Sequence, residues 1–84
     1  MSALILIVED EIDLAHTLQY SLERQGYQVE HVLTGKAALE RVVSQPMPEL
    51  VLLDLMLPDM SGHDICRRLR ADSRTEGIRV IMVT

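Results

Sequence analysis

Aromatic residues are nearly missing from this 84-residue chain, which has two tyrosines and neither phenylalanine nor tryptophan. Hydrophobic residues still make up 48% of it, so a core can form, and that core must be aliphatic. Cysteine occurs once, at Cys66, which excludes a disulfide framework and a cysteine-based zinc site and predicts a small buried hydrophobic residue. The length allows one small domain and no more.

Long apolar runs and an excess of positive charge are missing as well. No stretch reaches the length of a membrane-spanning helix, and the apolar start lacks the basic region of a signal peptide and runs directly into acids. We therefore expect no membrane contact and a cytoplasmic location. The net charge of −5 argues against nucleic-acid binding by this segment. The arginines between positions 67 and 79 are interpreted as a solvated helix face and loop.

The hydrophobic pattern alternates between the period of strands and the period of helices. Apolar runs predict strands at 4–8, 50–55 and 79–84, and a more polar run predicts an edge strand at 27–32. Helices are expected between them: one over 13–25 that ends at Gly26, one capped by Thr34 that ends before Pro46, and one capped by Ser61. Asp59 is interpreted as a turn residue.

Alternating strands and helices predict an α/β fold with a parallel sheet. Ligands of such sheets bind outside the carboxyl ends of the strands, which is where Glu9, Asp10, Asp54 and Thr84 fall. Asp54 also interrupts the most apolar run of the chain, 50–58. A carboxylate in such a run is costly unless it meets water, a metal or a donor, so the pattern predicts a shared cation site at the sheet edge.

Each of these residues has a plain structural alternative. Asp10 could begin a turn or cap the first helix, Asp54 could be a solvated strand end, and Thr84 could be an ordinary strand residue. Taken singly, the plain interpretation is the better one for Glu9, Glu11 and Thr84. Their combination at one sheet edge favours a site. The three histidines show no ligand spacing and are expected at the surface or partly packed.

Three segments at the predicted strand ends are distinctive as a set: IVEDE at 7–11, LLDLMLPDMSG at 52–62 and VIMVT at 80–84. Together they resemble the receiver domain of bacterial two-component response regulators. The turn after Asp54 most resembles the winged-helix transcription-factor subfamily, the OmpR/PhoB group. The resemblance covers the whole chain and implies a flavodoxin-like, doubly wound parallel sheet with strand order 2-1-3-4.

The resemblance also implies a role for each matching residue. Asp54 would be the phosphoacceptor for a sensor histidine kinase, and Thr84 the switch hydroxyl. Glu9, Asp10, Asp54 and the backbone carbonyl of Met56 would hold Mg²⁺. A receiver is not an enzyme beyond self-catalysed phosphotransfer and dephosphorylation. A phosphatase-type hydrolase would place a second acid two residues after its nucleophile, where Met56 stands.

The chain departs from the family pattern after its fourth strand. Receivers continue with a fourth helix, a fifth strand and a fifth helix, including a lysine that pairs with the phosphoryl group; the only lysine here is Lys36. Residues 1–84 are therefore interpreted as the N-terminal part of a truncated receiver without its DNA-binding effector domain. The exposed strand at 80–83 predicts self-association or a domain-swapped dimer. The alternative function is a non-switching fragment that binds metal or self-associates without phosphotransfer.

Overall fold

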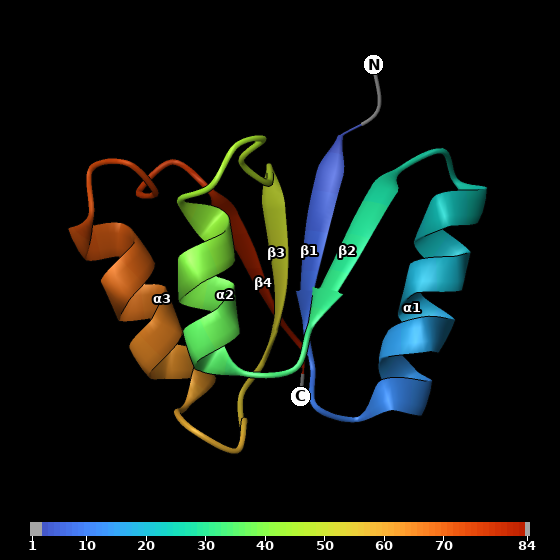
Figure 1. Ribbon diagram of the computed structural model, residues 1–84, viewed down its shortest axis with the longest axis horizontal. Helices are drawn as coiled ribbons and strands as arrows, with labels where there is room; N and C mark the ends of the chain where they lie inside the picture. The colour runs from blue at the N-terminus through green and yellow to red at the C-terminus, as the bar shows by residue number, and fades with distance from the viewer. Residues whose placement is uncertain (1–2, 84) are drawn as a thin grey trace.

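The computed structural model describes residues 3–83, whose four strands form one parallel sheet in the order β2-β1-β3-β4. The elements are β1 (Leu4–Val8), α1 (Ile12–Arg24), β2 (Gln28–Val32), α2 (Gly35–Val42), β3 (Leu50–Asp54), α3 (Gly62–Ala71) and β4 (Arg79–Val83). Figure 1 shows α1 on one flank and α2 and α3 on the other. The predicted α/β fold and its strand order are confirmed.

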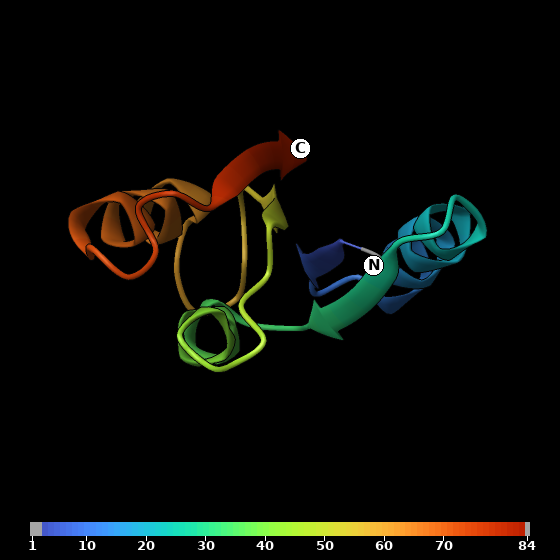
Figure 2. The ribbon, with the colours of Figure 1, turned by 90° about the horizontal axis from the view of Figure 1, so that it is seen from above.

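Helices cover both faces of the sheet. Seen from above in Figure 2, α1 lies alone on one side, and α2 and α3 lie together on the other. Right-handed crossovers produce this arrangement, because the chain steps outward from β1 to β2 and then returns past β1 to β3. The reversal makes the gap between β1 and β3 the topological switch point, where ligands of such sheets bind.

The main core lies between the sheet and the layer of α2 and α3. Every residue of β1 is buried, as expected of a strand covered on both faces. The buried cluster of this layer is aliphatic, as predicted, and consists of Leu6, Val8, Ala38, Val42, Val51, Leu53, Ile65, Leu69 and Ile78. Cys66 packs against this cluster but is only partly buried, which falls short of the burial expected for it.

The helix ends follow the local signals. The Thr34 hydroxyl accepts a hydrogen bond from Ala37 N at 3.1 Å, and the Ser61 hydroxyl accepts one from Asp64 N at 3.1 Å. Gly26 follows α1 with a φ of 97°, a conformation that favours glycine. The longest helix, α1, has 13 residues. No helix within residues 3–83 is both long enough and apolar enough to cross a membrane.

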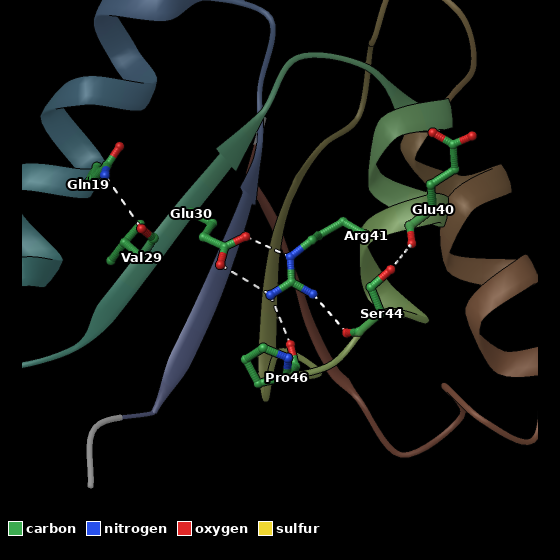
Figure 3. A network of polar contacts seen from close by, with 7 residues as sticks. All are labelled: Gln19, Val29, Glu30, Glu40, Arg41, Ser44 and Pro46. Atoms are coloured by element: carbon green, nitrogen blue, oxygen red, sulfur yellow. Dashed lines mark hydrogen bonds and ion pairs between the residues drawn. The ribbon is translucent and has the colours of Figure 1, made fainter.

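The polar edge strand β2 is attached to α2 through Arg41, as Figure 3 shows. Arg41 Nε lies 2.6 Å from Glu30 Oε1, and Nη2 lies 3.2 Å from Glu30 Oε2. The same guanidinium donates to the carbonyls of Ser44 and Pro46, at 2.9 Å each. These bonds from Arg41 lower the pKa of the Glu30 carboxyl. One side chain thus joins the edge strand, a helix and the loop before β3.

Candidate functional site

Three acidic side chains lie together at the carboxyl ends of β1 and β3. One carboxylate oxygen from each of Glu9, Asp10 and Asp54 lies within 4.8 Å of the other two. Val8 and Leu53 are level with each other in the two neighbouring strands, so the residues that follow them emerge at the same edge of the sheet. The structure therefore brings together the three carboxylates that the strand ends predicted.

The three carboxylates differ in their surroundings. Glu9 is 5% exposed, and its Oε1 accepts a hydrogen bond from Glu11 N at 2.9 Å. Burial raises the pKa of the Glu9 carboxyl, and the negative charges of Asp54 and Asp10 raise it further, against the opposing effect of the Glu11 hydrogen bond. Asp10 is exposed and Asp54 is half-buried. The cluster is thus closed on the Glu9 side and open to solvent on the Asp10 side.

The donor set suits a hard divalent cation. Mg²⁺ prefers oxygen ligands, binds through one or two carboxylates and keeps several of its waters, which the open side of the cluster allows. A cation bound here would also offset the mutual repulsion of the three carboxylates, which lie within 4.8 Å of one another. Glu9, Asp10 and Asp54 therefore fit a Mg²⁺ ion. The expected switch residue, Thr84, lies outside the described residues.

The loop after β3 starts beside the cluster and is closed by tight backbone contacts. Asp54 Oδ1 accepts a hydrogen bond from Met56 N at 3.2 Å, and Gly62 N donates to Leu55 O at 2.8 Å. A Cβ atom at Gly62 would lie 3.0 Å from Leu55 Cα and closer still to the carbonyl oxygen of Asp54. The start of α3 is therefore pressed against the residue that ends β3. Met56 itself is 82% exposed.

Two residues near the site have contacts that the sequence did not suggest. Asp59, interpreted as a turn residue, accepts hydrogen bonds from Gly35 N at 2.8 Å and Lys36 N at 2.9 Å. These bonds, led by the one from Gly35, lower the pKa of the Asp59 carboxyl. His31 is partly packed, as expected, and its Nε2 lies 2.7 Å from Glu9 O. Both contacts span more than twenty residues, so no local pattern could have indicated them.

Comparison with known proteins gives one consistent family. A family model described as the response regulator receiver domain matches residues 5–84. The phosphate regulon transcriptional regulatory protein PhoB of Rhizobium meliloti is 44% identical over 80 residues, which cover 95% of this chain and 35% of that protein. The sensory transduction protein RegX3 of Mycobacterium bovis is 48% identical, covering 95% and 34%. The chain spans about a third of the length of these curated relatives.

Solved structures agree with this result. The signal receiver domain of a signal transduction histidine kinase from Syntrophus aciditrophicus is 40% identical with a TM-score of 0.91, covering 99% of this chain and 62% of that one. The receiver domain of a Pseudomonas aeruginosa sensor histidine kinase is 27% identical with a TM-score of 0.91, covering 100% and 68%. That second structure has a magnesium ion coordinated in its active site cleft.

Proposed function

Because this chain belongs to the response regulator receiver family, we propose that Asp54 accepts a phosphoryl group from a phosphohistidine of a sensor histidine kinase. The observation that carries this proposal is the convergence of Glu9, Asp10 and Asp54 at the carboxyl edge of the sheet. That edge is the topological switch point, where α/β sheets place their ligands. A half-buried carboxylate with two acidic neighbours is suited to phosphoryl transfer assisted by a cation.

The transfer would be a displacement at phosphorus. An oxygen of Asp54 forms the new bond, while the bond between phosphorus and the kinase imidazole nitrogen breaks and leaves its electron pair on that nitrogen. Met56 N donates to Asp54 Oδ1, which orients the carboxylate and leaves Oδ2 as the attacking oxygen. The product is an aspartyl phosphate, whose added charge biases the surrounding surface and signals onward.

The metal ligands in this proposal are Glu9, Asp10, Asp54 and the backbone carbonyl of Met56. A bound Mg²⁺ supplies positive charge that neutralises the transferring phosphoryl group. The exposed Asp10 and the half-buried Asp54 would bind most directly, whereas the buried Glu9 accepts a hydrogen bond from Glu11 N and contributes mainly negative charge. The Thr84 hydroxyl is proposed as the switch group that binds a phosphoryl oxygen after transfer.

The intact mass of the purified protein, before and after Mg²⁺ and acetyl phosphate, tests the proposal. We expect a gain of one phosphoryl group that depends on Mg²⁺ and is lost in Asp54→Ala. Asp72→Ala is the matched control, because Asp72 lies in the turn after α3, away from the cluster, and this variant should be phosphorylated normally. A wild-type protein that binds Mg²⁺ but gains no phosphoryl group would instead support a metal-binding fragment that does not switch.

The proposal extends to the output of the protein. The curated relatives include transcriptional regulators, and this chain matches about a third of their length. We propose that the full-length protein acts in the cytoplasm and regulates transcription through DNA-binding residues outside 1–84, since this segment carries a net charge of −5. Turnover of phosphate esters in solution would contradict the proposal, because a receiver transfers its phosphoryl group only onto itself and then to water.

The open edge of the sheet supports a second proposal, for the 84-residue chain by itself. Within residues 3–83, β4 pairs with β3 on one side only, and Ile81 is 53% exposed. A groove beside it on the α1 face of the sheet is lined by Ile5, Leu22 and Leu50. An apolar edge strand of this kind pairs readily with another chain, so we propose self-association or a domain-swapped dimer through β4.

Size-exclusion chromatography with light scattering tests this second proposal. We expect a dimer whose population falls in Ile81→Lys, because a charged residue on an edge strand opposes pairing. Arg79→Lys lies on the same strand, keeps its charge and is the matched control. A wild-type protein that stays monomeric at high concentration rules out the self-association.

A further inference from the structure

The loop that follows the proposed phosphoacceptor is attached to α2 by a single carboxylate. Asp59 uses both of its oxygens: Oδ1 accepts from Gly35 N at 2.8 Å, and Oδ2 accepts from Lys36 N at 2.9 Å. These are the first two N–H groups of α2, which have no acceptor within the helix. The next N–H group, of Ala37, donates to Thr34. Asp59 thus completes the cap of a helix that lies more than twenty residues earlier in the chain.

A second contact presses the same loop onto α2. A Cβ atom at Gly35 would overlap the side chain of Met60 and would lie 3.0 Å from Ile65 Cδ1. Met60 therefore packs directly on the backbone at the start of α2. At its far end, the loop is closed by the hydrogen bond from Gly62 N to Leu55 O. The segment 56–61 is thus held between α2 on one side and the end of β3 on the other.

The position of Met56 depends on the backbone contacts of segment 56–61, because its side chain does little to hold it in place. Its side chain is 82% exposed and so contributes little packing against the core. Its backbone is fixed by the N–H bond to Asp54 Oδ1 and by an isolated bridge to Ser61. Ser61 is only two residues from Asp59, so a release of Asp59 from α2 would loosen the bridge and with it the Met56 carbonyl.

We infer that Asp59 is a positioning residue for the metal site: it holds segment 56–61 against α2 and thereby keeps the Met56 carbonyl where the cation binds. This inference rests on the proposed function, in which that carbonyl is a ligand. Asp59 lies outside the cluster of Glu9, Asp10 and Asp54 and acts only through the backbone of its loop. Without the hydrogen bonds from α2 to Asp59, the loop would become ordered only when the cation binds. The conformational entropy lost in that step weakens cation binding.

Titration of Mg²⁺ against the amide NMR signals of residues 54 and 56 tests this inference in the wild type, Asp59→Ala and Asp59→Asn. We expect the half-saturating Mg²⁺ concentration to rise about tenfold in Asp59→Ala, the size typical when a group supporting a metal ligand is removed. Asp59→Asn should show a smaller rise because its amide oxygen can still accept one of the two hydrogen bonds.

Asp72→Ala is the matched control. Asp72 also accepts a backbone hydrogen bond, from Arg74 N at 2.9 Å, but it lies in the turn after α3. Its loss should lower stability and leave the Mg²⁺ titration unchanged. The inference is overturned if Asp59→Ala remains folded by circular dichroism and has a lower urea midpoint, but titrates with Mg²⁺ as the wild type does. Asp59 would then be a helix cap with a structural role alone.

The phosphorylation assay separates this inference from the proposed function. A wild-type protein that binds Mg²⁺ but takes up no phosphoryl group contradicts phosphotransfer, while the titrations of the Asp59 variants still decide the role of Asp59. A wild-type protein whose amide signals do not respond to Mg²⁺ overturns the inference, because Met56 then has no cation to bind. The two failures are therefore distinguishable in the same set of samples.

Discussion

Alanine at Gly62 tests the close approach between the end of β3 and the start of α3. Gly62 is buried, and a Cβ atom there would lie 3.0 Å from Leu55 Cα and 3.1 Å from Asp54 C, with the Asp54 carbonyl oxygen closer still. Real Cβ atoms essentially never approach another atom to less than 3.0 Å. All three neighbours are backbone atoms, so no side-chain rotation relieves the overlap. Gly62→Ala must therefore displace either the end of β3 or the first turn of α3.

The size of the effect follows from the kind of overlap. Forcing an extra carbon into a packed interior costs about 1–3 kcal/mol when the backbone has to shift. Gly77 is the matched control, because a Cβ atom there would meet nothing within 4 Å and its φ is not positive. Gly77→Ala should stabilise the protein by about 0.4–1 kcal/mol, since alanine restricts the unfolded chain. The two variants should therefore differ by about 1.5–4 kcal/mol in the free energy of unfolding.

Urea denaturation followed by far-UV circular dichroism measures this difference. We expect a lower midpoint for Gly62→Ala and an equal or higher midpoint for Gly77→Ala, with similar slopes. The phosphoryl uptake of Gly62→Ala should also fall, because the displaced backbone carries Asp54. If the two alanine variants unfold at the same urea concentration, the close contact at Gly62 is not a real constraint and the reasoning is wrong.

Four further substitutions test charge and packing by the same urea assay. Glu9→Gln should stabilise the Mg²⁺-free protein at pH 7. The folded state raises the pKa of Glu9, so the contribution of Glu9 to folding stability is fully present below the ordinary pKa of 4.5 and is lost as pH rises through the raised pKa. A gap between wild type and Glu9→Gln that persists below pH 4.5 would contradict this. Arg41→Ala should cost more than Glu30→Gln, because Arg41 also donates to two loop carbonyls, and each such bond contributes about 1 kcal/mol. The folded state lowers the pKa of Glu30, so the contribution of Glu30 to folding stability should be present above pH 4.5 and fade as pH falls below it. Equal losses of stability in Arg41→Ala and Glu30→Gln would show that the bonds from Arg41 to the two carbonyls contribute nothing. Leu53→Ala, at a fully buried position, should cost about 2–5 kcal/mol, and a smaller loss would mean that the core collapses around the cavity.

The fold could be predicted because its signals are local. The continuous apolar run of β1 indicated burial on both faces, and the capping residues Gly26, Thr34 and Ser61 set helix ends within a residue or two. The expected α1 over 13–25 is observed at 12–24; its N-cap is Glu11, whose side chain makes no capping bond, so no cap marked that end. Each of these features depends on residues a few positions apart, where spacing and side-chain chemistry are visible directly.

The acidic cluster could be predicted for a related reason. Glu9, Asp10 and Asp54 each follow an apolar run, and once the sheet is parallel, the ends of neighbouring strands must meet at one edge. The roles proposed for these residues come from the family resemblance, since position alone does not distinguish a phosphoacceptor from a solvated acid.

Other features depend on contacts that form only when the elements pack against one another. The attachment of Asp59 to α2, the pairing of Glu30 with Arg41 and the pressure of Gly62 on β3 join residues that no sequence period relates. The burial that raises the pKa of Glu9 is likewise a property of the assembled site. Local patterns thus determine which elements form and which edge holds the acids. The packing of helices and loops onto the sheet determines how that edge is held, because the hydrogen bonds and close contacts between them exist only once the chain has folded.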